Sequence, residues 1–204
     1  MIGIIDYGSG NVLAIANVYK RLNIPFLIIN KEEDFEKVDK LILPGVGAFD
    51  EVMGTLNESG LKSILHEQVT GGKPVLGVCV GMQILGNHSD EGELNGFGWI
   101  DGEVKKFDIS KIKQKPLIPH LGWNSLEFVK NGSILDGIEK DVGFYFIHTY
   151  YFSCNNEEDI LATTHYGEEF TSAVQSGHVF GVQFHPEKSH ENGIIVFENF
   201  ANWK

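Results

Sequence analysis

The chain has 204 residues, of which 42% are hydrophobic and 22% charged, and its formal net charge is -12. This length suits one α/β domain with a single core, and the acidic balance argues against nucleic acid, whose phosphates are bound by clustered lysine and arginine. The apolar runs, such as residues 74–80, are far shorter than the roughly 18 residues of a membrane span. We therefore expect one domain over residues 1–204, a small-molecule substrate, no nucleic acid and no membrane.

The first residues already have the pattern of a buried strand and lack the basic region of a secretory signal. The two cysteines, Cys79 and Cys154, are too few for a disulfide framework or a metal cage with CxxC spacing. We therefore expect a cytoplasmic protein with at least one thiol free for chemistry, and neither a metal nor another cofactor.

In the first half of the chain, short apolar runs alternate with longer amphipathic stretches. These patterns predict strands at 2–6, 25–29, 40–43 and 74–78, and helices at about 11–22 and 50–70. Such alternation is typical of a parallel sheet covered by helices.

The second half is less regular and rich in glycine turns. It predicts a hairpin region at 95–108, an aromatic stretch at 144–152, strands near 160–164, 171–176 and 179–184, and a helix at 194–203. The expected fold is therefore α/β, with a mostly parallel central sheet flanked by helices and with mixed or antiparallel additions.

Residues 73–83 are the most informative stretch, because a buried strand leads into the pattern G-x-C-x-G around Cys79. This pattern predicts a sharp strand-to-helix turn, in which Gly77 and Gly81 allow close backbone approach. Cys79 would stand at a helix N-terminus that stabilises a thiolate, and the N–H of Val80 would point at a developing oxyanion. Alternatively, Cys79 is a small buried core residue, which is the usual position of a free cysteine.

Residues 181–187 predict a strand that ends at Pro186, since proline cannot continue a central ladder. His185 and Glu187 are two residues apart and would share one face of this strand. Together with Cys79 they would supply a nucleophile, a general base and an orienting carboxylate. Taken alone, the H-P-E sequence is better explained by a hydrogen-bonded histidine followed by a solvated charge; its combination with the cysteine turn favours catalysis.

Over nearly its whole length the sequence resembles the class I glutamine amidotransferases, and within them the glutaminase subunits of imidazole glycerol phosphate synthase. The segments that carry the resemblance are 5–11, 43–49, 77–83, 119–124, 144–151 and 181–189. The resemblance implies a flavodoxin-like domain in which Cys79 attacks the side-chain amide of glutamine. His185 would shuttle protons, Glu187 would hold the imidazole, and water would hydrolyse the thioester.

The same resemblance implies further residues of the site. Val46 and Gly47 would complete the oxyanion hole with Val80, in a segment that starts at Gly45. The residues implied to bind or line the substrate are Gly45, Gln83, Glu91, Thr149 and Tyr150. The implied partner is a (β/α)-barrel cyclase, which would form a heterodimer with this chain and use its ammonia in histidine biosynthesis.

Several alternatives remain open at this point. Leu121 and Ala14 stand where this branch usually has methionine and often has arginine, which leaves room for a paralogue that feeds a cyclase-like synthase in surface-sugar biosynthesis. A cysteine hydrolase or peptidase of the doubly wound type would use a similar turn, and a regulatory subunit could retain an inactive triad. The residues 8–10 could begin a dinucleotide loop, but Leu13 occupies the position of its third glycine.

Two of the implied site segments also have plain structural explanations. Residues 44–47 could be only a tight turn, and residues 148–150 could be ordinary packing at an aromatic strand.

Overall fold

The computed structural model describes residues 1–115, 117–130 and 132–204. The strands are β1 (Ile2–Ile5), β2 (Phe26–Ile29), β3 (Lys40–Gly45), β4 (Val75–Cys79), β5 (Gly102–Lys106), β6 (His120–Asn124), β7 (Glu127–Phe128), β8 (Phe144–His148), β9 (Tyr150–Cys154), β10 (Ile160–Tyr166), β11 (Glu168–Ser176) and β12 (Val179–Val182). The α-helices are α1 (Val12–Arg21), α2 (Phe49–Glu58), α3 (Leu61–Thr70), α4 (Val80–Gln83) and α5 (His190–Asn202). The 3-10 helices are η1 (Glu32–Lys37), η2 (Ile109–Lys111), η3 (Glu157–Asp159) and η4 (Pro186–Lys188).

The central sheet has the order β2-β1-β3-β4-β12-β11-β10-β7, with β9 paired to β11 and β5 paired to β9. The strands from β2 to β12 in this order run parallel, and those beyond β12 pair antiparallel. Strands β6 and β8 form a separate antiparallel pair. The predicted mostly parallel sheet with antiparallel additions is therefore confirmed.

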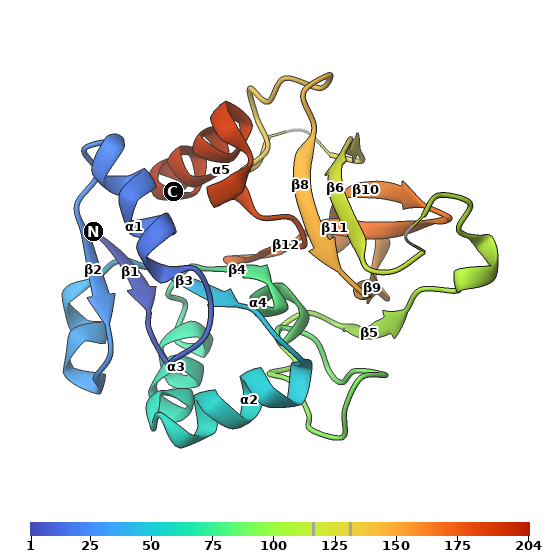
Figure 1. Cartoon of the computed structure of the whole chain (residues 1–204). Coiled ribbons are helices and arrows are strands. Elements are labelled where there is room, and N and C mark those ends of the chain that lie inside the picture. The colour runs from blue at the N-terminus through green and yellow to red at the C-terminus, as the bar shows by residue number, and fades with distance from the viewer. Residues whose placement is uncertain (116, 131) are drawn as a thin grey trace.

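Helices cover both faces of the parallel part of the sheet, with α1 and α5 on one side and α2 and α3 on the other (Figure 1). Every residue of β1, β4 and β12 is buried, which explains their nearly continuous apolar sequences. Tyr19 of α1 packs against Phe197 of α5, with ring centroids 5.5 Å apart.

None of the helices in the described part of the chain is long and apolar enough to cross a membrane.

The predicted helix at 50–70 is wrong as a single element, because α2 ends at Glu58 and α3 begins at Leu61. Gly60 separates them with a φ of 78°, a left-handed conformation that glycine adopts at no steric cost and that interrupts a helix. The C-terminal helix also begins earlier than predicted, at His190 rather than at residue 194.

The predicted hairpin at 95–108 is also wrong. The backbone of residues 96–99 bonds back to residues 84–87, for example from Phe97 N–H to the Ile84 carbonyl at 2.8 Å. Only 102–106 forms a strand, and it pairs with β9. The backbone hydrogen bonds of the glycine-rich stretch are thus satisfied by a segment that follows α4.

Candidate active site

Cys79 is the last residue of β4 and directly precedes α4. Its backbone has φ 56° and ψ -114°, a conformation that costs a non-glycine residue energy and persists only where the surroundings impose it. Close packing supplies that constraint. A Cβ atom on Gly81 would lie 1.9 Å from the Leu43 carbonyl oxygen, and one on Gly45 would lie 2.5 Å from the Gly81 nitrogen. The glycines therefore let β3 and α4 meet and hold Cys79 at the turn.

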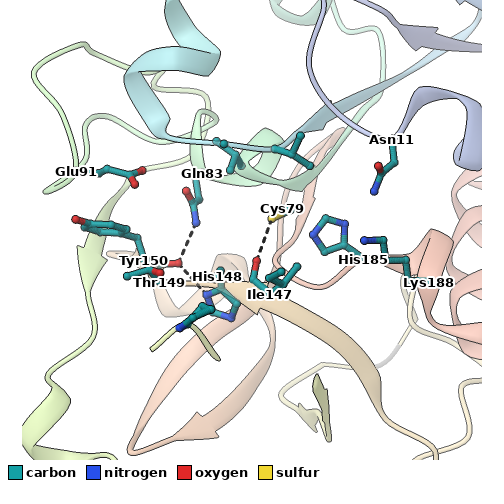
Figure 2. Close-up of a pocket in the computed structure, with 14 residues that line it drawn as sticks. Asn11, Cys79, Gln83, Glu91, Ile147, His148, Thr149, Tyr150, His185 and Lys188 are labelled. Atoms are coloured by element: carbon teal, nitrogen blue, oxygen red, sulfur yellow. Dashed lines mark hydrogen bonds between the residues drawn. The ribbon is translucent and has the colours of Figure 1, made fainter. Parts of the chain in front are cut away.

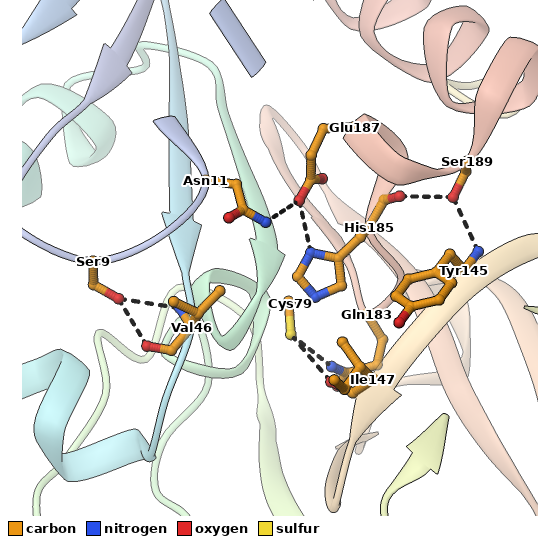
Figure 3. A network of polar contacts seen from close by, with 10 residues as sticks. All are labelled: Ser9, Asn11, Val46, Cys79, Tyr145, Ile147, Gln183, His185, Glu187 and Ser189. Carbon is orange, nitrogen blue, oxygen red and sulfur yellow. Dashed lines mark hydrogen bonds and ion pairs between the residues drawn. The ribbon is translucent and has the colours of Figure 1, made fainter. Parts of the chain in front are cut away.

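His185 lies just beyond β12, and its backbone is fixed on both sides. Its N–H donates to the Tyr145 carbonyl at 2.9 Å, and the Ser189 hydroxyl donates to its carbonyl at 2.6 Å (Figure 3). The Nδ1 atom lies 2.8 Å from Oε1 of Glu187, and the two side chains are only 3% and 1% exposed.

The predicted reason for this contact is wrong in its local structure. Strand β12 ends at Val182, and Glu187 belongs to the 3-10 turn η4 rather than to an extended strand. The turn that begins at Pro186 carries the carboxylate back towards the imidazole of His185.

Asn11 completes the fixing of the carboxylate, because its Nδ2 donates to Oε1 of Glu187 at 2.8 Å. With Nδ1 of His185 bonded to Glu187, Nε2 is left on the side of the ring that faces Cys79 (Figure 3). Within the described residues, this Nε2 is buried and has no hydrogen-bond partner. Asn11 was not among the residues predicted to form the site, and nothing in its local sequence pattern connects it with a carboxylate 176 positions away.

The charge state of the pair follows from these contacts. Burial alone would lower the pKa of His185, but Cys79 and Glu187 outweigh burial and raise it to about 10. Burial would raise the pKa of Glu187, but the hydrogen bond and charge of His185 outweigh it and lower the pKa. At neutral pH the imidazole is therefore protonated, and its positive charge faces the sulfur that would act as nucleophile.

A pocket of about 380 Å³ opens beside Cys79 (Figure 2). This volume lies in the range of small-molecule sites. Its walls are formed by Asn11, Val46, Gly47, Cys79, Val80, Gln83, Glu91, Pro119, Ile147, His148, Thr149, Tyr150, His185 and Lys188. Of the residues predicted for the site, Gly45 and Glu187 are absent from this lining: Gly45 serves the packing of β3 on α4, and Glu187 stands behind His185.

The two sides of the predicted oxyanion hole differ in availability. Val80 is the first residue of α4 and lines the pocket, where the N–H groups of a helical first turn lack intrahelical acceptors. Val46 is engaged elsewhere: its N–H donates to the Ser9 hydroxyl at 3.1 Å, and that hydroxyl donates to the Val46 carbonyl at 2.8 Å (Figure 3). The Val46 N–H is thus occupied by Ser9 in this conformation.

Gln83 and Glu91 reach the pocket while holding contacts within the protein. Nε2 of Gln83 donates to the Tyr150 carbonyl at 3.0 Å and to Oε1 of Gln183 at 3.1 Å. Oε2 of Glu91 accepts a hydrogen bond of 2.8 Å from the Phe49 N–H at the start of α2. Both side chains are therefore fixed before any substrate arrives.

Comparison with known proteins identifies the family. The family model for glutamine amidotransferase class-I matches residues 3–203. The chain belongs to this family. A protein from Leptospira borgpetersenii, named imidazole glycerol phosphate synthase subunit HisH, is 47% identical over 99% of this chain and 100% of its own length. The protein of the same name from Bdellovibrio bacteriovorus is 48% identical over 98% of this chain and 99% of its own length.

Solved structures show that the fold is also that of glutamine amidotransferases. A crystal structure described as a glutamine amidotransferase has a TM-score of 0.70 at 21% identity and covers 98% of both chains. The structure of PurLQS from Thermotoga maritima has a TM-score of 0.70 at 18% identity, covering 99% of this chain and 97% of its own.

Proposed function

We propose that this class-I amidotransferase is the glutaminase subunit of an imidazole glycerol phosphate synthase. It hydrolyses L-glutamine to glutamate and ammonia, and a (β/α)-barrel cyclase uses the ammonia in histidine biosynthesis. The observation that carries the glutaminase activity is Cys79 at a strained turn, facing the His185–Glu187 pair beside a pocket. The two relatives named as subunits of this synthase support the choice of pathway. A thiol nucleophile suits the reducing cytoplasm.

The acylation half-reaction begins with the Cys79 thiolate, which attacks the side-chain carbonyl carbon of glutamine. A C–S bond forms and the carbonyl π electrons move to oxygen, where the Val80 N–H stabilises the negative charge. The His185 imidazolium then donates its proton to the leaving nitrogen. The C–N bond breaks, ammonia leaves, and Cys79 carries a thioester.

The deacylation half-reaction uses the neutral His185 as general base. It takes a proton from water while the water oxygen attacks the thioester carbonyl. When the tetrahedral intermediate collapses, the C–S bond breaks and the thiolate–imidazolium pair is restored. The product leaves with a γ-carboxyl group that loses its proton to water, which gives glutamate. Glu187 keeps the imidazole oriented throughout and stabilises its positive charge.

The part of the pocket away from Cys79 suits the α-amino and α-carboxyl groups of glutamine. The Glu91 carboxylate is the group to accept hydrogen bonds from the α-ammonium. The backbone around Thr149 and Tyr150 forms the wall opposite Glu91 (Figure 2). Contacts to the whole amino acid position its amide at Cys79. The firm contacts of Gln83 and Glu91 keep these walls in place.

The docking face for the cyclase is the outer side of the β6–β8 pair, next to the pocket. Leu121 and Ile147 are paired across these strands, and together with Trp123 they are large apolar side chains that are 51%, 40% and 46% exposed. Ile147 also lines the pocket. Exposed apolar side chains grouped on one face are typical of a protein interface, and this one would seal the ammonia against water.

The test is to measure glutamate release from the purified chain alone, with its (β/α)-barrel cyclase, and with the cyclase and an acceptor-site ligand. Because Ser9 occupies the Val46 N–H, we expect slow hydrolysis by the chain alone and a rate roughly 100-fold higher or more in the full complex, the effect of gaining one oxyanion donor. Equal rates in all three would contradict partner control, and no glutamate in any of them would contradict the glutaminase function.

A further inference from the structure

Gln183 is a fully buried residue beside the nucleophile that the chemistry above does not use. It follows β12, and its backbone N–H donates to the Ser172 carbonyl at 2.9 Å, which extends the pairing with β11 by one residue. Its side chain and that of His185, two positions later, both approach Cys79 (Figure 3). Nε2 of Gln183 lies 3.8 Å from the Cys79 sulfur.

Neighbouring groups determine which end of the Gln183 amide faces the sulfur. The Tyr150 carbonyl can only accept a hydrogen bond, so Gln83 must present its NH₂ group there. The same NH₂ group donates to the amide oxygen of Gln183 at 3.1 Å. Reversing Gln183 would set two NH₂ groups against each other and an oxygen against the sulfur. The hydrogen-bond pattern therefore directs an N–H of Gln183 at Cys79.

The Tyr150 carbonyl, which holds Gln83 in place, is itself fixed by further hydrogen bonds. The Tyr150 carbonyl also accepts a hydrogen bond from Nδ1 of His148 at 2.8 Å, and Nε2 of that ring lies 2.9 Å from Nδ1 of His120. Asn124 Nδ2 lies 3.1 Å from the far nitrogen of His120. Since an amide NH₂ only donates and a carbonyl only accepts, both histidines are neutral with the proton on Nδ1.

We propose that Gln183 is a further catalytic residue, which donates a side-chain N–H to the Cys79 thiolate and has its orientation set by Gln83. The proposal rests on the proposed glutaminase function. The donor stabilises the thiolate before attack and again when the C–S bond of the thioester breaks and negative charge returns to sulfur. The Ile147 carbonyl, 4.0 Å from the sulfur, accepts a hydrogen bond only from the thiol form and so cannot take this role.

The test compares Gln183→Met with the parent protein in a Cys154→Ser background, where Cys79 is the single thiol. Methionine keeps the length of the side chain and removes the donor. Ultraviolet thiolate absorbance at neutral pH, corrected with a thiol-free Cys79→Ser variant, gives the thiolate-to-thiol ratio. We expect this ratio to fall roughly tenfold, the lower end of the effect of a hydrogen bond to a charged group, because the contact is long. Thioester hydrolysis, measured in the complex by single turnover, should slow as well.

Thr164→Val is the matched control. Thr164 is fully buried, and its hydroxyl donates to the Ser125 carbonyl at 3.1 Å, so its loss perturbs the core without removing a contact to Cys79. A second variant, Gln183→Glu, keeps the size and the acceptor for Gln83 while replacing the donor, and should suppress the thiolate at least as strongly. Thermal unfolding establishes that each variant is folded.

An unchanged thiolate ratio in the folded Gln183 variants would overturn the proposal, as would an equal loss in Thr164→Val. The absorbance measurement needs no glutamine. If the wild-type chain hydrolyses glutamine but the Gln183 variants keep its thiolate-to-thiol ratio, only the role of Gln183 is overturned. If the wild-type chain never hydrolyses glutamine, the proposed function is overturned and the thiolate result still stands.

Discussion

His185 and Glu187 are joined through Nδ1 and Oε1 at 2.8 Å, His185 immediately preceding the 3-10 turn η4 that contains Glu187, and both side chains are buried. Asn11 donates to the same carboxylate oxygen from the N-terminal part of the chain. The carboxylate is therefore held by two separate segments, and the imidazole is held by the carboxylate. This arrangement fixes a proton on Nδ1 and leaves Nε2 for chemistry at the sulfur.

Glu187→Gln tests the orienting role of the carboxylate. The amide can no longer stabilise the imidazolium and can present a donor to Nδ1, which favours the wrong tautomer. We expect kcat for glutamate release by the cyclase complex to fall roughly 100-fold or more, with KM nearly unchanged because Glu187 does not line the pocket. Glu191→Gln, at an exposed site paired with Arg21, should leave both parameters unaltered. A loss confined to KM would argue against the role.

Ser9→Ala tests how Val46 is held. The Ser9 hydroxyl bonds both the N–H and the carbonyl of Val46, so its removal should free that peptide to turn its N–H towards the oxyanion. Gly47, with φ 109°, gives the segment the freedom to do so. Because two exposed hydrogen bonds are worth little net free energy, we expect glutamate release by the isolated chain to rise roughly threefold to tenfold. Ser9→Thr keeps the hydroxyl and should stay slow, and an equally slow Ser9→Ala would disprove the idea.

Much of the fold and site could be predicted because the decisive residues are neighbours in sequence. The elbow around Cys79 and the H-P-E sequence at His185 have local patterns with a chemical reason, and the apolar runs of the parallel strands follow from burial on both faces. Gln183 was missed although the same period-two alternation that places His185 also places Gln183 on its side of the segment. A buried amide has no distinctive sequence pattern, so only the contacts of Gln183 in the structure indicate a role for it.

Other features depend on contacts that no local pattern records. The bond from Asn11 to Glu187 joins residues far apart in sequence, and the bond from Ser9 to Val46 joins two turns. The hairpin predicted at 95–108 failed because tertiary hydrogen bonds to residues 84–87 outweighed the local turn propensity. The substrate-binding role of Gly45 stays a prediction; its close approach to Gly81 is a tertiary packing contact that no local pattern records.

The buried histidine pair predicts how stability depends on pH. Burial lowers the pKa of His120 to about 4 and that of His148 to about 3, whereas both titrate near 6.5 in an unfolded chain. The unfolded state therefore binds more protons below pH 6.5, and stability falls as the pH drops from about 6.5 towards 4. His185 has the opposite sign: its pKa is raised to about 10, so its contribution is complete below about 6.5 and is lost as the pH rises towards 10.

Urea unfolding at pH 7 and pH 5 measures the acid limb. Each buried histidine should account for a loss of about 2 kcal/mol between these values. His120→Gln should remove about half of the combined loss from the two histidines, whatever the substitution does to stability at pH 7. His165→Gln, at an exposed position of β10, is the control and should keep the wild-type slope. If the free energy of unfolding of His120→Gln falls between pH 7 and pH 5 as much as that of the wild type, the histidine pair does not cause the loss of stability in acid.

The most direct test of a glutaminase that feeds a synthase is to compare glutamine with ammonium as the nitrogen source for the cyclase complex. Cys79→Ala should abolish glutamine-dependent synthesis and glutamate release, since the other cysteine, Cys154, does not line the pocket, while synthesis from added ammonium continues at the wild-type rate. Cys154→Ala should retain both activities. Glutamate release that persists in Cys79→Ala would contradict the account.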